Sequence, residues 1–225
     1  MPRHPQVART TEGLSASVFS RLAAKAKEIG DVAPLHVGDT WLDPLEAARA
    51  EAQRSDAHAR LHNYAPVQGE PELLDAIVRH IERRSGVARP RELVQVMSGA
   101  TPGLGVVVDA LVDPGEEVIV PSPFWPLIRG TLERRGASAI EVPFFTRLGE
   151  PGFDPERELE RHVGPRTVAI YLNTPHNPTG AVLGERELSA IARVAERHDL
   201  WVFSDEVYED LWLGDEPYPS PWARP

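Results

Sequence analysis

The stretch TVAIYLNTPHNPTG, residues 167–180, decides how this chain folds. Its first six residues, 167–172, form an almost wholly apolar run that is typical of a buried strand. The eight residues that follow pack two asparagines, two prolines and a glycine into one loop. A connection from a strand to a helix needs only about one or two such residues. The surplus of side-chain amides therefore indicates a loop with a binding role.

Strands and helices alternate on both sides of this stretch. Apolar runs predict strands over residues 93–97, 117–120, 139–142, 167–172 and 200–203, and a short extended segment over 35–37. Helical spacing of apolar residues predicts helices over 15–28, 44–54, 71–81, 101–111, 127–135, 155–162 and 185–197, with Asp43 as the N-cap of the second. Such alternation is typical of an α/β fold in three αβα layers, with a mostly parallel sheet.

The composition excludes several classes of protein. The chain has 225 residues, a formal net charge of −10 and no cysteine. The acidic balance argues against a nucleic acid or an anionic membrane as partner, since both call for a basic surface. Disulfides and thiolate metal sites are excluded by the absence of cysteine. The sequence has neither a signal-peptide pattern nor an apolar run of roughly 18 residues, so the cytoplasm is the expected location.

Four polar stretches directly follow predicted strands. They are SGATPG (98–103), PSPFWP (121–126), NTPHNPTG (173–180) and SDEVYED (204–210). In parallel α/β sheets, ligands bind in the crevice at the carboxyl ends of the strands. We therefore expect the four stretches to face one crevice.

The first three stretches offer groups that suit a flat, phosphorylated ligand. Small residues around Ala100 and Thr101 leave backbone N–H groups accessible at a predicted helix start, which suits an anion such as phosphate. The ring of Trp125 or of Phe124 can stack on a planar ligand. The amide of Asn177 can donate to a ring oxygen. Each feature also has a purely structural interpretation, as a plain strand–turn–helix connection, a core ring or a turn.

The fourth stretch offers a carboxylate at the end of an apolar strand. Asp205 is costly there unless it has a cationic or hydrogen-bonding partner, although a helix N-cap would also explain it. Tyr208 follows three residues later, on the same side of a helical turn. The four stretches together match pyridoxal phosphate, whose protonated pyridine ring withdraws electrons from the α-carbon of an amino acid. A carboxylate beside the ring nitrogen keeps that nitrogen protonated.

At these residues the sequence resembles the class I/II aminotransferases, which are fold-type I pyridoxal-phosphate enzymes. NPTG at 177–180 and SDEVY at 204–208 place Asp205 28 residues beyond Asn177, and NYAPVQGEPEL at 63–73 supports the match. The resemblance runs from about residue 35 to the end of the chain. It implies the large domain of this fold, incomplete at the C-terminus: residues 1–45 are an N-terminal arm and the start of the small domain, and residues 46–225 are part of the cofactor-binding large domain.

The resemblance implies a role for each of the residues singled out above. Ala100 and Thr101 would bind the phosphate of the cofactor through backbone and hydroxyl. Trp125, in preference to Phe124, would stack on the pyridine ring, and Asp205 would pair with its nitrogen. Gly38 would line the substrate pocket.

Other residues are assigned in the same way. Asn177 would donate to the ring hydroxyl of the cofactor, with Tyr208 as its companion. Tyr64 would reach the phosphate of a neighbouring subunit, so a homodimer is implied for the full-length form. The family also implies cis peptide bonds before Pro123 and Pro178.

One departure from the family is severe. The family forms its Schiff base with a lysine well beyond the Asp/Tyr motif, whereas the two lysines of this chain are Lys25 and Lys27, on a predicted surface helix. We therefore assign no catalytic residue. The family's arginine for the substrate carboxylate and two strands of its sheet also follow the last residue, Pro225. We expect a fragment, a frameshifted product or half of a split enzyme, which is inactive and poorly stable alone.

The implied reaction is amino-group transfer between an amino acid and a 2-oxo acid. Other α-carbon chemistry on the same scaffold, such as that of a C–S lyase or a cyclase, remains an alternative, because fold does not fix reaction. A second alternative is a non-catalytic, aminotransferase-like binding module of a regulator, although no basic DNA-binding domain precedes the resemblance. His58 and His62 have a chelating i, i+4 spacing but no third ligand, so no metal site is expected.

Overall fold

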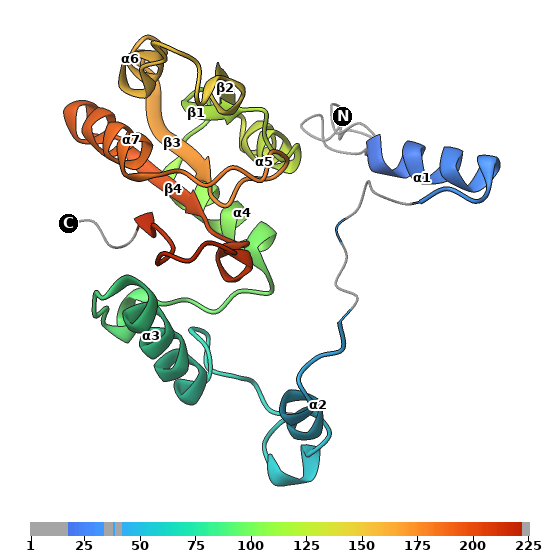
Figure 1. The fold of residues 1–225 in the computed structure, drawn as a ribbon. Coiled ribbons are helices and arrows are strands. Elements are labelled where there is room, and N and C mark those ends of the chain that lie inside the picture. The colour runs from blue at the N-terminus through green and yellow to red at the C-terminus, as the bar shows by residue number, and fades with distance from the viewer. Residues whose placement is uncertain (1–17, 34–37, 39–41, 222–225) are drawn as a thin grey trace, which may run out of the picture.

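The computed structural model describes residues 18–33, 38 and 42–221 of the chain, so the extended segment predicted over 35–37 lies outside the described residues. Its centre is a parallel four-stranded sheet in the order β2-β1-β3-β4 (Figure 1). The strands are β1 (Glu117–Ser122), β2 (Ser138–Pro143), β3 (Thr167–Asn173) and β4 (Trp201–Asp205). The predicted α/β class with a parallel sheet is confirmed.

Seven α-helices and four short 3₁₀ turns lie within the described residues. The helices are α1 (Val18–Ile29), α2 (Glu46–Ala52), α3 (Pro71–Ser85), α4 (Ala100–Leu111), α5 (Leu127–Arg135), α6 (Pro155–Glu160) and α7 (Glu185–His198). The 3₁₀ turns are η2 (Ser55–Ala57), η3 (Arg91–Leu93), η4 (Phe145–Arg147) and η5 (Glu209–Leu211). None of these helices combines the length and the apolar character that crossing a bilayer requires.

The two central strands, β1 and β3, bury both of their faces, which produces three layers. Ile119 and Ile170 pack with residues of α6 and α7 on one face of the sheet. Val118 and Ala169, their neighbours in the chain, pack with α4 and α5 on the other face. This alternation follows from the two-residue period of a strand. Because both of its faces are covered, β3 is apolar at nearly every position, as its sequence predicted.

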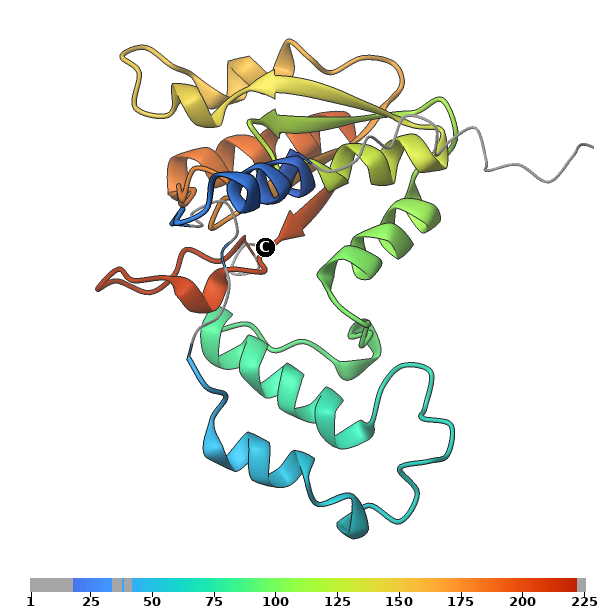
Figure 2. The same ribbon diagram turned by 90° about the vertical axis from the view of Figure 1, so that its right-hand side faces the viewer.

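The chain before α4 lies apart from this layered unit. Figure 1 and Figure 2 show α2 and α3 to one side of the sheet, outside the helices that cover its faces. Among the described residues before Val108, Leu74 on α3 is the one that is buried. The N-terminal part therefore has little apolar core of its own.

The strand predicted over residues 93–97 is absent, so that prediction is wrong. Residues 91–93 form η3, and Val94 has extended backbone angles, but residues 94–97 pair with no strand. The amide of Val96 instead donates to the carbonyl of Gln68. A strand needs a neighbour to satisfy its backbone groups, and no described strand lies beside this segment. The local pattern was that of a strand, but the partner is missing.

Two predicted helix starts also differ from the structure. The second helix begins at Glu46 with Leu45 at its N-cap, so Asp43 does not cap it. The carboxylate of Asp43 lies 3.7 Å from the guanidinium of Arg49 instead. Helix α4 begins at Ala100, with Gly99 at the N-cap position. Apolar spacing located α4 and the Asp43–Pro44 pair located α2, but neither pattern fixes the residue at which a helix begins.

One side of the sheet is open within the described residues. Strand β4 lies at the edge, where Trp201 is 56% exposed and Val202 39% exposed. Strand β4 thus leaves apolar side chains exposed along one of the two edges of the sheet. Val106 and Val107 of α4 are exposed as well.

Candidate cofactor site

A cavity of about 200 Å³ lies at the carboxyl ends of β3 and β4. The start of α4 and the loops after β1, β3 and β4 supply its walls. The lining residues are Ala100, Thr101, Leu104, Trp125, Asn173, Asn177, Asp205, Val207 and Tyr208. The structure thus brings together all four polar stretches that the sequence placed at strand ends. Six of the predicted cofactor residues lie in this cavity: Ala100, Thr101, Trp125, Asn177, Asp205 and Tyr208.

The carboxylate of Asp205 is held by a donor on each oxygen. The phenol of Tyr171 donates to Oδ2 over 2.8 Å, and the backbone N–H of Val207 donates to Oδ1 over 3.2 Å. Burial, and then the nearby Asp205 carboxylate, raise the pKa of Tyr171 well above its usual range, so its phenol stays protonated. The carboxylate is therefore fixed in direction at the edge of the cavity.

Asn173 is a site residue that the sequence reasoning missed. It is 4% exposed, and its Nδ2 donates to the backbone carbonyl of Asp205 over 2.9 Å. Its Oδ1 accepts from the backbone N–H of Asn177 over 2.8 Å. One buried amide thus ties the end of β4 to the loop that carries Asn177. The sequence offered a clue, since Asn173 is the first amide of the loop and ends the strand as Asp205 does.

The side chains of Asn177 and Tyr208 meet inside the cavity. Nδ2 of Asn177 donates to the phenol oxygen of Tyr208 over 3.2 Å. The Asn177–Pro178 and Ser122–Pro123 bonds are cis, as the resemblance implied, and the Thr174–Pro175 bond is also cis. The two predicted companions are therefore adjacent, on loops that follow neighbouring strands.

The start of α4 presents uncapped backbone donors to the cavity. Gly99 precedes the helix with a φ of 128°, and no side chain caps the first turn. The N–H groups of Ala100 and Thr101 fall in the first turn, where a helix has no internal acceptors. Helix α6, by contrast, is capped by Asp154, whose carboxylate accepts from two backbone N–H groups. The open start of α4 is suited to an anion.

The two rings of PSPFWP have different surroundings. Trp125 lines the cavity. Phe124 packs against the apolar cluster under α4 and α5, with the guanidinium of Arg129 5.4 Å from its ring centroid. The structure therefore favours Trp125 over Phe124 as the ring that faces a ligand.

His176 belongs to the loop but not to the cavity. It is 3% exposed and stacks on Phe145, with ring centroids 3.4 Å apart and an interplanar angle of 9°. Its Nδ1 lies 2.7 Å from Oγ1 of Thr179, and its buried Nε2 has no hydrogen-bond partner among the described residues. Burial lowers the pKa of His176 to about 4, so the ring is neutral near pH 7. It acts as a packing and hydrogen-bonding neighbour that shapes the loop.

Two other predicted site residues lie elsewhere, as do the two lysines. Tyr64 is fully exposed, in the segment between α2 and α3. Gly38 is exposed, and within the part of the chain that the structure describes no atom lies within 4 Å of the position that a side chain would take there. Lys25 and Lys27 are exposed on α1, which Figure 1 shows apart from the sheet. Among the described residues, no lysine lines the cavity.

Comparison with known proteins agrees with this geometry. The sequence pattern of the family "Aminotransferase class I and II" matches residues 30–224. The aspartate/prephenate aminotransferase of Thermus thermophilus is 36% identical over 218 residues, which are 94% of this chain and 55% of that protein. The arginine–pyruvate transaminase AruH of Pseudomonas aeruginosa is 36% identical over 209 residues, 92% of this chain and 52% of that protein.

Solved structures show the same relationship. A double mutant of Thermus thermophilus aspartate aminotransferase has a TM-score of 0.88 at 34% identity, over 98% of this chain and 58% of that one. The N-succinyldiaminopimelate aminotransferase of Mycobacterium tuberculosis has a TM-score of 0.84 at 33% identity, over 96% and 56%. The chain spans about half the length of the curated relatives it matches. It belongs to the aminotransferase class I and II family.

Proposed function

We propose that this chain forms the cofactor-binding part of a pyridoxal-phosphate-dependent aminotransferase, which exchanges an amino group between an amino acid and a 2-oxo acid. The observation that carries the proposal is the cavity at the ends of β3 and β4. It gathers an uncapped helix start, an aromatic wall, a paired amide and phenol, and a fixed carboxylate. Family membership supports the same assignment.

The donor set of the cavity fits the chemical groups of pyridoxal phosphate. The N–H groups of Ala100 and Thr101 fit a phosphate. The carboxylate of Asp205 fits a protonated ring nitrogen, because an opposite charge favours the protonated form. Asn177 and Tyr208 fit a ring hydroxyl. When bound, the cofactor would supply an electron-withdrawing ring that stabilises negative charge at the α-carbon of an amino acid.

The chain's own residues bind and orient the cofactor in this proposal. Tyr171 and the backbone of Val207 hold the Asp205 carboxylate in place, so that its charge faces the cavity. Asn173 fixes the distance between Asp205 and the Asn177 loop. Trp125 excludes water from one wall. We assign no catalytic residue within the 225 residues, so binding without turnover is the behaviour we expect of this chain by itself.

The named relatives support the substrate class without selecting a substrate. Their names include aspartate or prephenate, arginine with pyruvate, and N-succinyldiaminopimelate. We therefore propose an amino acid and a 2-oxo acid as substrates. No observation favours a C–S lyase, a cyclase or a non-catalytic binding module.

Several further expectations complete the proposal. The full exposure of Tyr64 is compatible with a role toward a second subunit, and we propose a homodimer for the full-length form. We also propose a cytoplasmic location, a role for Gly38 near the substrate, and a division of the chain into an N-terminal arm (1–45) and a partial large domain (46–225).

The test is ligand binding by the 225-residue protein. Pyridoxine 5′-phosphate is the preferred probe, because it lacks the aldehyde that would react with Lys25 or Lys27. Saturable quenching of tryptophan fluorescence is expected, since Trp125 lines the cavity. Asp205→Asn should weaken binding about tenfold, because a charge-assisted hydrogen bond becomes a neutral one.

The matched control is Asp109→Asn. Asp109 is also on the α4 side of the molecule, but it is half exposed and pairs with Arg134 on the surface. The Asp109→Asn substitution should leave the dissociation constant for pyridoxine 5′-phosphate unchanged. Absence of saturable binding by the wild type, or equal binding by Asp205→Asn, would contradict the proposal.

A further inference from the structure

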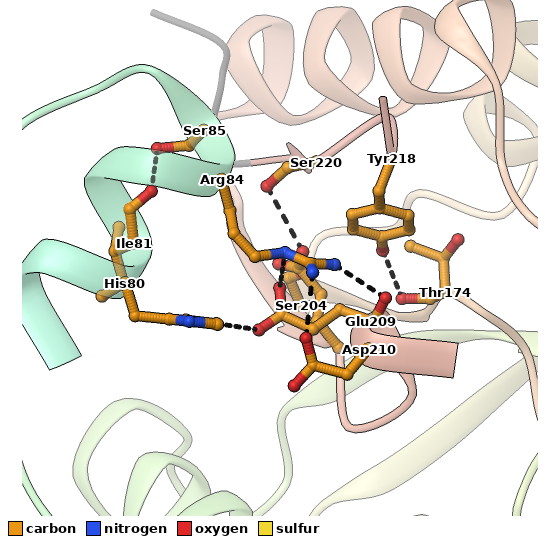
Figure 3. A network of polar contacts seen from close by, with 11 residues as sticks. His80, Ile81, Arg84, Ser85, Thr174, Ser204, Glu209, Asp210, Tyr218 and Ser220 are labelled. Atoms are coloured by element: carbon orange, nitrogen blue, oxygen red, sulfur yellow. Dashed lines mark hydrogen bonds and ion pairs between the residues drawn. The ribbon is translucent and has the colours of Figure 1, made fainter. Parts of the chain in front are cut away.

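We propose that Arg84 is a positioning residue, which acts from α3 to hold both Tyr208 and the Asn177 loop in place at the cofactor cavity. The inference rests on the proposed function and adds to it a residue that does not line the cavity. It also explains how a helix outside the layered unit contributes to the site. Figure 3 shows the contacts of Arg84 with Glu209 and Asp210, and the contact of Tyr218 with Thr174.

The guanidinium of Arg84 binds the turn that follows β4 through hydrogen bonds. Its Nη2 donates to the backbone carbonyl of Glu209 over 2.7 Å, and its Nη1 donates to Oδ1 of Asp210 over 2.9 Å. Its Nε lies 3.7 Å from a carboxylate oxygen of Glu209. The side chain of Arg84 is 28% exposed, so these contacts are partly shielded from water. A planar guanidinium suits such a fork of acceptors, whereas a lysine presents only a point charge.

These contacts of Arg84 restrain the turn to which Tyr208 belongs. Tyr208 is the N-cap of η5, and its carbonyl accepts from the backbone N–H of Leu211 over 2.9 Å. Arg84 therefore fixes the turn that begins at Tyr208. The phenol of Tyr208 is the group that meets Asn177 in the cavity, over 3.2 Å. Loss of the guanidinium would release the turn and with it the phenol.

A second link runs from Arg84 to the Asn177 loop through Tyr218. The guanidinium carbon lies 5.8 Å from the centroid of the Tyr218 ring, within the range of a cation–π contact. The buried phenol of Tyr218 donates to the carbonyl of Thr174 over 2.6 Å. The N–H of Thr174 in turn donates to the carbonyl of Asp205 over 3.1 Å. Thr174 lies between Asn173 and Asn177, so this contact holds the base of the loop.

A metal site explains the same cluster less well. His80, Glu209 and Asp210 bring ligand atoms within 4.8 Å of one another. The guanidinium of Arg84 already pairs with both of these carboxylates, so their charge is balanced within the protein. His80 adds a contact of 3.4 Å from Nε2 to Glu209. The cluster is accordingly a salt-bridge network that attaches α3 to the turn.

The experiment compares four variants of the 225-residue protein. Arg84→Ala removes both links, Arg84→Lys keeps the charge without the fork, and Tyr218→Phe removes the contact with Thr174 alone. Arg83→Ala is the matched control, because it removes the same charge from the exposed neighbouring position of α3. Hydrogen exchange of backbone amides and binding of pyridoxine 5′-phosphate are measured for each.

Each variant has its own expected pattern. Arg84→Ala should speed exchange in both the 173–180 and the 206–211 segments and weaken binding about tenfold, while the amides of β1 and β3 stay protected. Arg84→Lys should restore part of the loss. Tyr218→Phe should loosen the 173–180 segment but not the 206–211 turn. Arg83→Ala should match the wild type.

Three results would overturn the inference, and each differs from failure of the proposed function. One is unchanged exchange in both segments in Arg84→Ala. Another is faster exchange throughout the sheet, which would make Arg84 a general stability residue. Exchange does not depend on ligand, so it decides the inference even if the wild type binds no probe. The third concerns binding: if the wild type binds and Arg84→Ala binds equally well, the positioning role is wrong and the proposed function stands.

Discussion

The described residues before and after Gly99 are stabilised in different ways. After Gly99, two apolar clusters fill the space between the sheet and its four helices, and many of their side chains are completely buried. Before Gly99, Leu74 is the buried residue among those the structure describes. The region after Gly99 follows the rule that apolar burial drives folding. The region before Gly99 depends on polar contacts such as those of Arg84.

The difference indicates which part of the chain is a folding unit and which part is attached to it. The layered unit carries its own core and most of the cofactor cavity. The N-terminal part exposes large apolar side chains, including Leu45 at 81% and Leu61 at 69%. Substitutions in the two regions should therefore differ strongly in their effect on stability, and three experiments sharpen that contrast.

The largest expected effect comes from a core leucine. Leu132→Ala should lower the free energy of unfolding by about 2–5 kcal/mol, because Leu132 is completely buried and the substitution leaves a cavity. Leu61→Ala is the same chemical change at a site 69% exposed, and it should cost less than about 0.5 kcal/mol. Urea unfolding followed by circular dichroism measures both. Equal losses would show that the N-terminal part has a core after all.

An effect of intermediate size is expected from pH. Burial lowers the pKa of His176 to about 4 in the folded protein, against about 6.5 in an unfolded chain. The unfolded state therefore binds more protons between these values, and stability should fall as the pH drops from about 6.5 to about 4, by up to about 3 kcal/mol. Urea unfolding at a series of pH values measures this slope.

The role of His176 in this pH dependence can be tested directly by substitution. His176→Gln should flatten the slope between about pH 6.5 and 4, since the titrating group is gone. His58→Gln, an exposed histidine of the N-terminal region, is the matched control. A slope that survives in His176→Gln would assign the pH dependence to other groups.

The smallest expected effect concerns a helix cap. Asp154→Ala should cost about 1 kcal/mol, because its carboxylate accepts from the N–H groups of Glu156 and Arg157 at the start of α6. Asp43→Ala should cost less than about 0.5 kcal/mol, because Asp43 forms an exposed ion pair with Arg49 and does not cap α2. Thermal unfolding compares the two. A larger loss of stability in Asp43→Ala than in Asp154→Ala would show that Asp43 caps the helix as the sequence predicted.

Much of the fold was predictable from local patterns. The helix predicted over 127–135 coincides with α5, and the other strands and helices of the layered unit lie within a few residues of their predicted bounds. The strand over 93–97 failed because strand formation depends on a neighbour that the local sequence does not describe. The Asp43 prediction failed because the helix begins at Glu46 with Leu45 at its N-cap and no side-chain cap, so the residue preferred at an N-cap did not decide where the helix starts.

The cavity was predictable in its membership but not in its bonding. The stretches placed after predicted strands identified six lining residues, because the carboxyl ends of parallel strands meet at one edge. Ala100 and Thr101 are the exception, since no described strand precedes them and the start of α4 brings them to the cavity.

Tyr171 was missed because a tyrosine inside an apolar strand is usually a core side chain. Its partner, Asp205, is 34 residues away in sequence. Arg84 was missed because an arginine on an amphipathic helix is usually a solvated surface residue. Its partners Glu209 and Asp210 are also far away in the sequence.

The sequence by itself determined the α/β class, the strand ends that carry chemistry, and the family. These follow from short-range periodicity and from residue types at fixed spacing. Only the tertiary structure decided that Asn173 lies opposite Asp205, that Tyr171 reaches its carboxylate, and that Arg84 holds the turn after β4. The reason is physical: the parallel register of β3 and β4 and the docking of α3 join residues far apart in the chain, and no local pattern encodes such contacts.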